Sequence, residues 1–150
     1  MKKWSLVIAL IAWMMGTPLL HAAGSEQEEI NKKNVIAFYE KAINEKDFEA
    51  AAHYLGPRYI QHNPLAADGP EGLKKFLAFL REKFPQSHSE IKRVFAEGDF
   101  VILHVHSVWE PGTRGRAIVD VFRLENGKIV EHWDVGQDIP EKSANANGMF

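Results

Sequence analysis

Two apolar stretches in the second half of the chain decide the fold: Val101-Ile102-Leu103-His104-Val105-His106-Ser107-Val108 and Ala117-Ile118-Val119-Asp120-Val121-Phe122. Both are rich in β-branched residues and are separated by turn residues, so they predict neighbouring β-strands. Side chains along a strand alternate between faces, so His104 and His106 point the same way. Burying ionisable groups among apolar ones is costly unless they have partners. The pattern therefore predicts a pocket lined by two imidazoles and the Asp120 carboxylate.

The rest of the chain predicts helices first and strands afterwards. A first helix is predicted to open at the polar residues 25–29 and to run to about 45, where apolar residues recur at helical spacing. The same spacing predicts helices over 48–54 and 73–84, and a short strand is predicted over 58–62. Turn residues then separate four predicted strands, which cover 89–96, 100–110, 114–124 and 128–135. Helices followed by an antiparallel meander indicate an α+β fold with the helices on one face of the sheet.

The N-terminus has the pattern of a secretory signal peptide. Lys2 and Lys3 precede an apolar run over 6–15, and small residues follow at 22–24. The alternative is a membrane anchor, but the run is shorter than the about 20 residues that span a bilayer. We therefore expect a signal peptide over 1–24, a single domain over 25–141, a flexible tail over 142–150, and a periplasmic or secreted mature protein without a stable anchor.

The cysteine content and the net charge limit the kinds of partner that we expect. The chain has no cysteine, so its core must hold the fold without disulfides. Its formal net charge is −2 and no basic patch stands out, so we expect neither nucleic acid nor an anionic membrane surface as a partner. A small molecule is the expected ligand.

Asp120 is the first candidate for chemistry, because its neighbours on the same strand face are apolar. Desolvation there should raise the pKa of the carboxyl and suit it to act as general base or acid, with His104 and His106 as further catalytic candidates. In the last strand His132 and Asp134 share one face while Trp133 lies on the other. The candidate ligand-binding residues are His62, Asn63, Trp109, His132, Trp133 and Asp134.

Three segments carry a family resemblance. The stretch Tyr59–Pro64, the loop Asp68–Gly72 and the long motif Asp120–Asp134 resemble the SnoaL-like family of the nuclear transport factor 2-like superfamily. The resemblance implies a cone-shaped curved sheet, wrapped by helices around an internal pocket, and a homodimer. It also implies chemistry, because polyketide cyclases of this group use a strand carboxylate for an aldol ring closure without metal or cofactor. Those roles would fall on Asp120, His104 and His106.

Three hypotheses follow for function. The first is a cofactor-independent cyclase, lyase or isomerase that removes a proton beside a carbonyl group. The second is a periplasmic protein that binds a small ligand without chemistry. The third is a metal-dependent enzyme with a divalent ion on His104 and His106, joined by His62 or Asp120. The spacing from Gly98 to Glu110 also resembles the first cupin metal motif, but the second motif is missing and the helical first half does not suit a cupin barrel.

Overall fold

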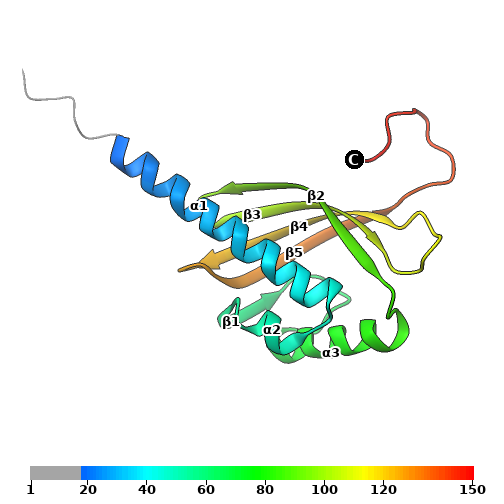
Figure 1. Cartoon of the computed structure of the whole chain (residues 1–150), viewed down its shortest axis with the longest axis horizontal. Coiled ribbons are helices and arrows are strands. Elements are labelled where there is room, and N and C mark those ends of the chain that lie inside the picture. Colours follow the sequence, from blue (N-terminus) through cyan, green and yellow to red (C-terminus); the bar gives the residue numbers. More distant parts are fainter. Residues whose placement is uncertain (1–17) are drawn as a thin grey trace, which may run out of the picture.

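The computed structural model describes residues 18–150 of the chain, with side chains from residue 26 onward. In chain order the elements are α1 (Pro18–Tyr39), the π-helix η1 (Glu40–Asn44), α2 (Phe48–Ala52), β1 (Leu55–Gln61), α3 (Gly69–Lys83), β2 (His88–Glu97), β3 (Phe100–Val108), β4 (Arg116–Glu125) and β5 (Lys128–Asp138). Helices wrap one side of a curved sheet, which confirms the predicted α+β cone (Figure 1).

The five strands form one sheet in the order β1-β5-β4-β3-β2. The meander from β2 to β5 is antiparallel, as predicted. The edge strand β1 differs, because it pairs with β5 in parallel. The chain leaves β1 through α3 and three further strands before it returns as β5, so this pair is joined by a long crossover that permits parallel pairing. The sheet is therefore mixed.

Helix α1 lies across one face of the sheet, which we call the inner face (Figure 1). Phe38 of α1 meets Phe122 of β4 edge-on, with ring centroids 5.9 Å apart. Alternation along β3 and β4 puts the buried side chains on this face, including Val101, Leu103, Val105, Phe122 and Leu124. The opposite, outer face is not covered by the helices. Asp120, His132 and Asp134, described below, lie on this same inner face, next to the apolar core.

The helices depart from the predicted bounds for local reasons. The helix predicted over about 25–45 begins earlier, at Pro18, and its last turn widens into η1. The Asp47 carboxylate accepts a hydrogen bond from the backbone N–H of Ala50 at 3.0 Å, so it caps α2.

The ends of the chain bear on two further predictions. Most of the predicted signal peptide falls on residues 1–17, which lie outside the described residues, and its boundary at residue 24 lies within α1. Among the described helices, none is both long and apolar enough to cross a membrane. Residues 142–150 form no helix or strand, yet the Phe150 ring lies 5.2 Å from the His104 ring and 4.9 Å from the His106 ring.

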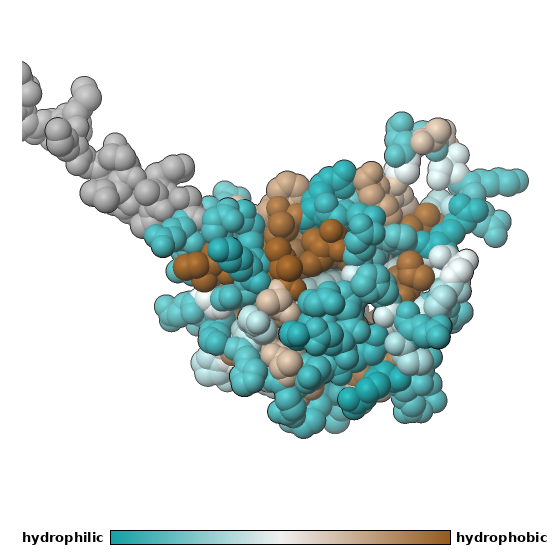
Figure 2. Space-filling view, viewed as in Figure 1, coloured by the Kyte–Doolittle hydropathy of each residue, from teal (hydrophilic) through white to brown (hydrophobic). Residues whose placement is uncertain are grey.

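The surface seen from the α1 side is mainly hydrophilic, with hydrophobic patches over α1 and the neighbouring strands (Figure 2). Exposed apolar side chains include Ile30 and Ile36 on α1. Others belong to the outer sheet face, namely Phe95, Phe100, Ile102, Val119 and Val135.

Candidate active site

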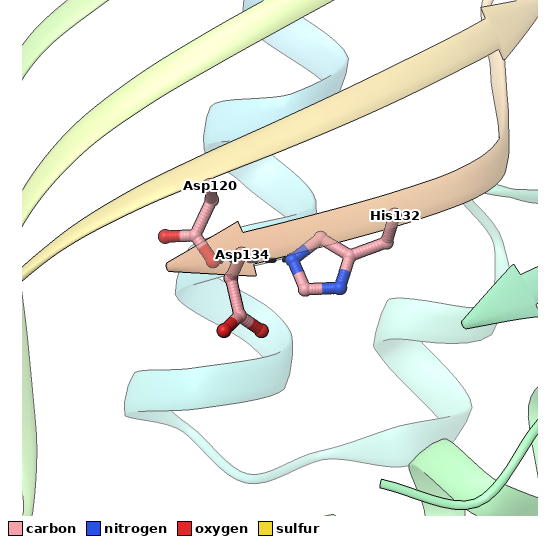
Figure 3. Close-up of side chains that lie close together, drawn as sticks. All are labelled: Asp120, His132 and Asp134. Carbon is pink, nitrogen blue, oxygen red and sulfur yellow. Dashed lines mark hydrogen bonds and ion pairs between the residues drawn. The ribbon is translucent and has the colours of Figure 1, made fainter. Parts of the chain in front are cut away.

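A cavity of about 160 Å³ lies between the inner face of the sheet, α1, α3 and the end of β1. Most of its wall is apolar, with contributions from Phe38, Leu73, Phe76 and Ile118. Asp120, His132 and Asp134 belong to the polar part of the wall, and their side chains converge from β4 and β5 (Figure 3).

Strand register explains why these three side chains meet. Asp120 of β4 lies directly opposite Asp134 of β5, and Phe122 lies opposite His132. His132 and Asp134 are two residues apart, so both point to the inner face with Asp120. Asp120 is 5% exposed and His132 is 8% exposed. Two facing carboxylates in such a buried setting repel each other, which favours a proton or another positive partner between the strands.

The Asp120 carboxyl is bound on one side only. Its Oδ1 lies 3.1 Å from His132 Nε2, while its buried Oδ2 has no hydrogen-bond partner among the described residues. Burial raises the pKa of Asp120, and the hydrogen bond with His132 opposes that rise without reversing it. A carboxyl with a raised pKa and one free oxygen at a cavity has the properties expected of a general base or acid.

Gln61 fixes the protonation of the His132 ring. Gln61 Oε1 accepts a hydrogen bond from the backbone N–H of Asn63 at 2.9 Å, so this amide atom must be the oxygen. The same oxygen lies 3.0 Å from His132 Nδ1, which therefore carries a hydrogen. The hydrogen bond between His132 Nε2 and Asp120 Oδ1 then needs one more proton, held by either partner. Asp120 and His132 thus share one proton and together carry no net charge.

Asn63 holds the third polar side chain in place. Its Oδ1 accepts from the backbone N–H of Leu65 at 2.8 Å, which turns its Nδ2 toward Asp134. Asn63 Nδ2 lies 2.9 Å and 2.7 Å from the two carboxylate oxygens of Asp134. The Asn63-Pro64 turn that ends β1 therefore orients a carboxylate on β5.

Two tyrosines add hydroxyl groups to the cavity wall. Tyr39 is the last residue of α1 and Tyr59 lies on β1, and both are buried. Burial, followed by the nearby Asp120 charge, raises the pKa of each phenol, so both stay protonated at neutral pH. The Tyr59 hydroxyl accepts a hydrogen bond from Gln61 Nε2 at 3.1 Å, which leaves its own proton free to donate.

The prediction that His104 and His106 face Asp120 is wrong. Leu103 is the residue opposite Asp120, whereas His104 lies opposite Val119 and His106 opposite Ala117. Neighbouring strands share faces at paired positions, so the two imidazoles lie on the outer face. There Arg93 donates to His104 Nδ1 at 3.0 Å, and His106 Nε2 donates to the Arg114 carbonyl at 2.8 Å.

The six predicted ligand-binding residues divide between the two faces. Asn63, Trp109, His132 and Asp134 line the cavity. His62 and Trp133 do not: their rings stack on the outer face, with centroids 4.6 Å apart, and His62 bonds to Glu131 at 2.8 Å. Alternation could have shown this, because His62 and Asn63 are consecutive.

Sequence reasoning missed five polar residues of the cavity, namely Tyr39, Tyr59, Gln61, Ser107 and Arg116. Alternation from Asn63 identifies Gln61 and Tyr59 as residues on its own strand face. No comparable signal marked Tyr39, because it is one of the apolar and aromatic residues that recur at helical spacing in its segment.

The structure does not assemble the predicted metal set. His104 and His106 lie on the opposite side of the sheet from Asp120, and His62 is separated from them by β5 and β4. A different set does come together in the described part of the chain: one donor atom from each of Asp120, His132 and Asp134, all within 4.8 Å of one another. Two carboxylates and an imidazole could accept a divalent ion, but here Asp120 and His132 bind each other and Asp134 binds Asn63.

A wider groove of about 620 Å³ adjoins the cavity. Ser107, Trp109 and Arg116 line both spaces, so the groove offers one approach to the cavity. Arg116 is already engaged there, because its Nε lies 2.8 Å from Asp138 Oδ1.

The fold and the polar cavity define a cone-shaped α+β protein with an internal site, and comparison identifies its family. The SnoaL-like domain model matches residues 35–132, which is more than half of the chain. The chain therefore belongs to the SnoaL-like family. A search of curated proteins gave no match.

Solved structures agree on the fold. TsrD from Streptomyces laurentii is 20% identical with a TM-score of 0.60, over 71% of this chain and 87% of that one. A candidate polyketide cyclase from Acidithiobacillus ferrooxidans is 22% identical with a TM-score of 0.61, over 71% and 87%. A cystatin-fold protein from Novosphingobium aromaticivorans is 24% identical with a TM-score of 0.60, over 70% and 97%. At these identities the likeness concerns the fold alone.

Proposed function

We propose that this chain is an enzyme that moves a proton at a carbon next to a carbonyl group, without a cofactor. The observation that carries the proposal is the buried Oδ2 of Asp120, which has no hydrogen-bond partner among the described residues and belongs to a cavity-lining carboxyl with a raised pKa. The family and its candidate polyketide cyclase members support this class of chemistry. Aldol-type cyclisation, retro-aldol cleavage and isomerisation all share the same first step.

In that step Asp120 Oδ2 takes the proton from the carbon, and the C–H electron pair moves into the carbonyl to give an enolate. The oxygen that gains the charge needs a donor, and the outer-face histidines cannot supply one. The Tyr39 and Tyr59 hydroxyls line the same cavity and remain protonated, so they are the donors we assign. His132 is a positioning residue, because its proton bonds to Oδ1 and leaves Oδ2 to react.

The step can be tested by hydrogen exchange. 2-Hydroxyacetophenone in D₂O, followed by proton NMR, reports exchange at the carbon next to its carbonyl. We expect the protein to accelerate exchange and Asp120→Asn to lose about 100-fold or more of that acceleration, the usual contribution of a positioned base. The matched control is the double variant His104→Ala and His106→Ala, which alters the outer face and should retain the wild-type rate.

The outcomes separate the hypotheses. Exchange that survives Asp120→Asn would refute the assigned base. Loss of exchange in the outer-face double variant would show that the reaction needs His104 and His106. A protein that binds the ketone in the cavity but never accelerates exchange would instead be the ligand-binding protein of the second hypothesis.

A further inference from the structure

The cavity restricts its ligand by volume. Its 160 Å³ is close to the roughly 150 Å³ of an apolar cavity that accommodates benzene. A ligand seated there has the bulk of about one six-membered ring, and a polycyclic skeleton does not fit within it. Trp109 lines both the cavity and the wider groove, so a longer substituent can extend past that ring into the groove.

The cavity also restricts its ligand by charge. Among the described residues that line it, the carboxyl, imidazole and guanidinium groups belong to Asp120, Asp134, His132 and Arg116, and the phenols of Tyr39 and Tyr59 stay neutral. Asp120 and His132 share a proton, so the pair carries no net charge, and Arg116 is paired with Asp138 at 2.8 Å. Asp134 remains, with a negative charge stabilised by one amide group. An anionic group in this partly buried space would meet a carboxylate without a counter-ion.

The hydrogen-bonding groups that remain free are complementary to one particular pattern. Asp134 and Asp120 offer acceptors within 4.8 Å of each other, and the Tyr59 hydroxyl offers a donor. A ligand with a hydroxyl group on the carbon beside its carbonyl can donate to Asp134, present the C–H of the same carbon to Asp120, and accept a tyrosine hydrogen bond at the carbonyl.

We propose that the ligand is an uncharged α-hydroxy carbonyl compound with an apolar body about the size of one ring, and that Asp134 selects it against carboxylates. The inference rests on the proposed function for the role of Asp120, but its selectivity is a property of binding alone. The proposal assigns Asp134 a role in ligand selection, which the proton transfer itself does not require.

A matched series of phenyl ketones tests the proposal: acetophenone, 2-hydroxyacetophenone and benzoylformate share one skeleton and differ in the hydroxyl and the carboxylate. Binding is followed by the indole N–H signal of Trp109 in NMR titrations. The indole of Trp133, on the outer face, is the internal control. No turnover is needed, so failure of the exchange experiment leaves this measurement intact.

We expect 2-hydroxyacetophenone to bind about tenfold more tightly than acetophenone, because it gains a hydrogen bond to a charged acceptor. Benzoylformate should bind at least tenfold more weakly than 2-hydroxyacetophenone. Asp134→Asn should compress both ratios toward one, whereas Asp99→Asn, at an exposed turn, should leave them unchanged. Equal or tighter binding of benzoylformate to the wild type overturns the proposal. Absence of any Trp109 shift, or equal shifts of both indoles, overturns it as well.

Discussion

Replacing Asp120 by Asn should make the folded protein more stable at neutral pH, although it removes a buried hydrogen-bonding group. Asn has the shape of Asp, and its Nδ2 can donate to His132 Nε2, so the 3.1 Å contact survives. What disappears is the cost of ionising a buried carboxyl, which is expressed in its raised pKa. A change of one pKa unit corresponds to about 1.4 kcal/mol, and we expect a gain of that order.

The gain must depend on pH in a definite direction. An unfolded Asp has a pKa of about 3.9, and burial raises the folded-state pKa of Asp120 above its ordinary value. Between the two pKa values the folded chain holds a proton at Asp120 that the unfolded chain lacks. The wild-type free energy of unfolding therefore falls as pH rises from about 4 through the folded-state pKa, by up to about 1.4 kcal/mol per pH unit. Asn does not titrate, so the variant escapes this loss.

Urea denaturation of both proteins at pH values from 4 to 8 measures the difference directly. The difference between variant and wild type should rise with pH and level off above the folded-state pKa. Other titrating groups are common to both proteins and cancel. Asp99→Asn, an exposed acid-to-amide change, should show no such rise. Parallel stability profiles for Asp120→Asn and wild type, or a wild type that gains on the variant as pH rises, would refute the account of Asp120 as a desolvated carboxyl.

Further predictions concern packing, assembly and processing. Phe122→Ala should cost about 3 to 5 kcal/mol in urea unfolding, because a fully buried ring against Phe38 is lost. Gly56→Ala should cost about 1 to 3 kcal/mol, because its Cβ would lie 2.7 Å from Val130 Cγ1; an unchanged midpoint would contradict this contact. The homodimer stays a prediction: light scattering should give twice the monomer mass, and Val119→Lys on the outer face should halve it. Intact mass after expression with export should lack about 24 residues.

The architecture could be predicted because both of its sequence signals are local. Helical spacing before residue 84 and turn residues at 97–99, 111–113 and 125–127 each identify an element without knowledge of its partners. The observed strands begin and end within three residues of the predicted ones. Alternation around Asp120 also predicts its inward direction, because its face of β4 is apolar.

The pairing of His104 and His106 with Asp120 could not be predicted, because it depends on register between strands. Alternation relates residues within one strand only, and a shift of one residue exchanges the two faces. Both faces of β3 are apolar in sequence: Val101, Leu103 and Val105 alternate with Phe100 and Ile102. The hydrophobic pattern therefore gave no basis for choosing between them. The connection from Val108 to Arg116 is too long for turn geometry to impose a register.

The site itself depends on an irregularity in β5. Ile129 lies opposite Leu124, and the next pair downstream joins Glu131 to Arg123, so β5 carries one extra residue, Val130, at this point. A bulge of this kind exchanges the faces of all residues that follow it. Ile129 is therefore buried in the core, Glu131 turns outward, and His132 and Asp134 turn inward.

Without the bulge, strict alternation from Ile129 would direct Glu131 into the core and His132 to the outer face, away from Asp120. The neighbouring strand accommodates the extra residue with a glycine, because a side chain at position 56 would collide with Val130. The Gly56-Pro57 pair therefore has a direct structural role: by making room for the bulge, it allows β5 to present an imidazole and a carboxylate to the cavity.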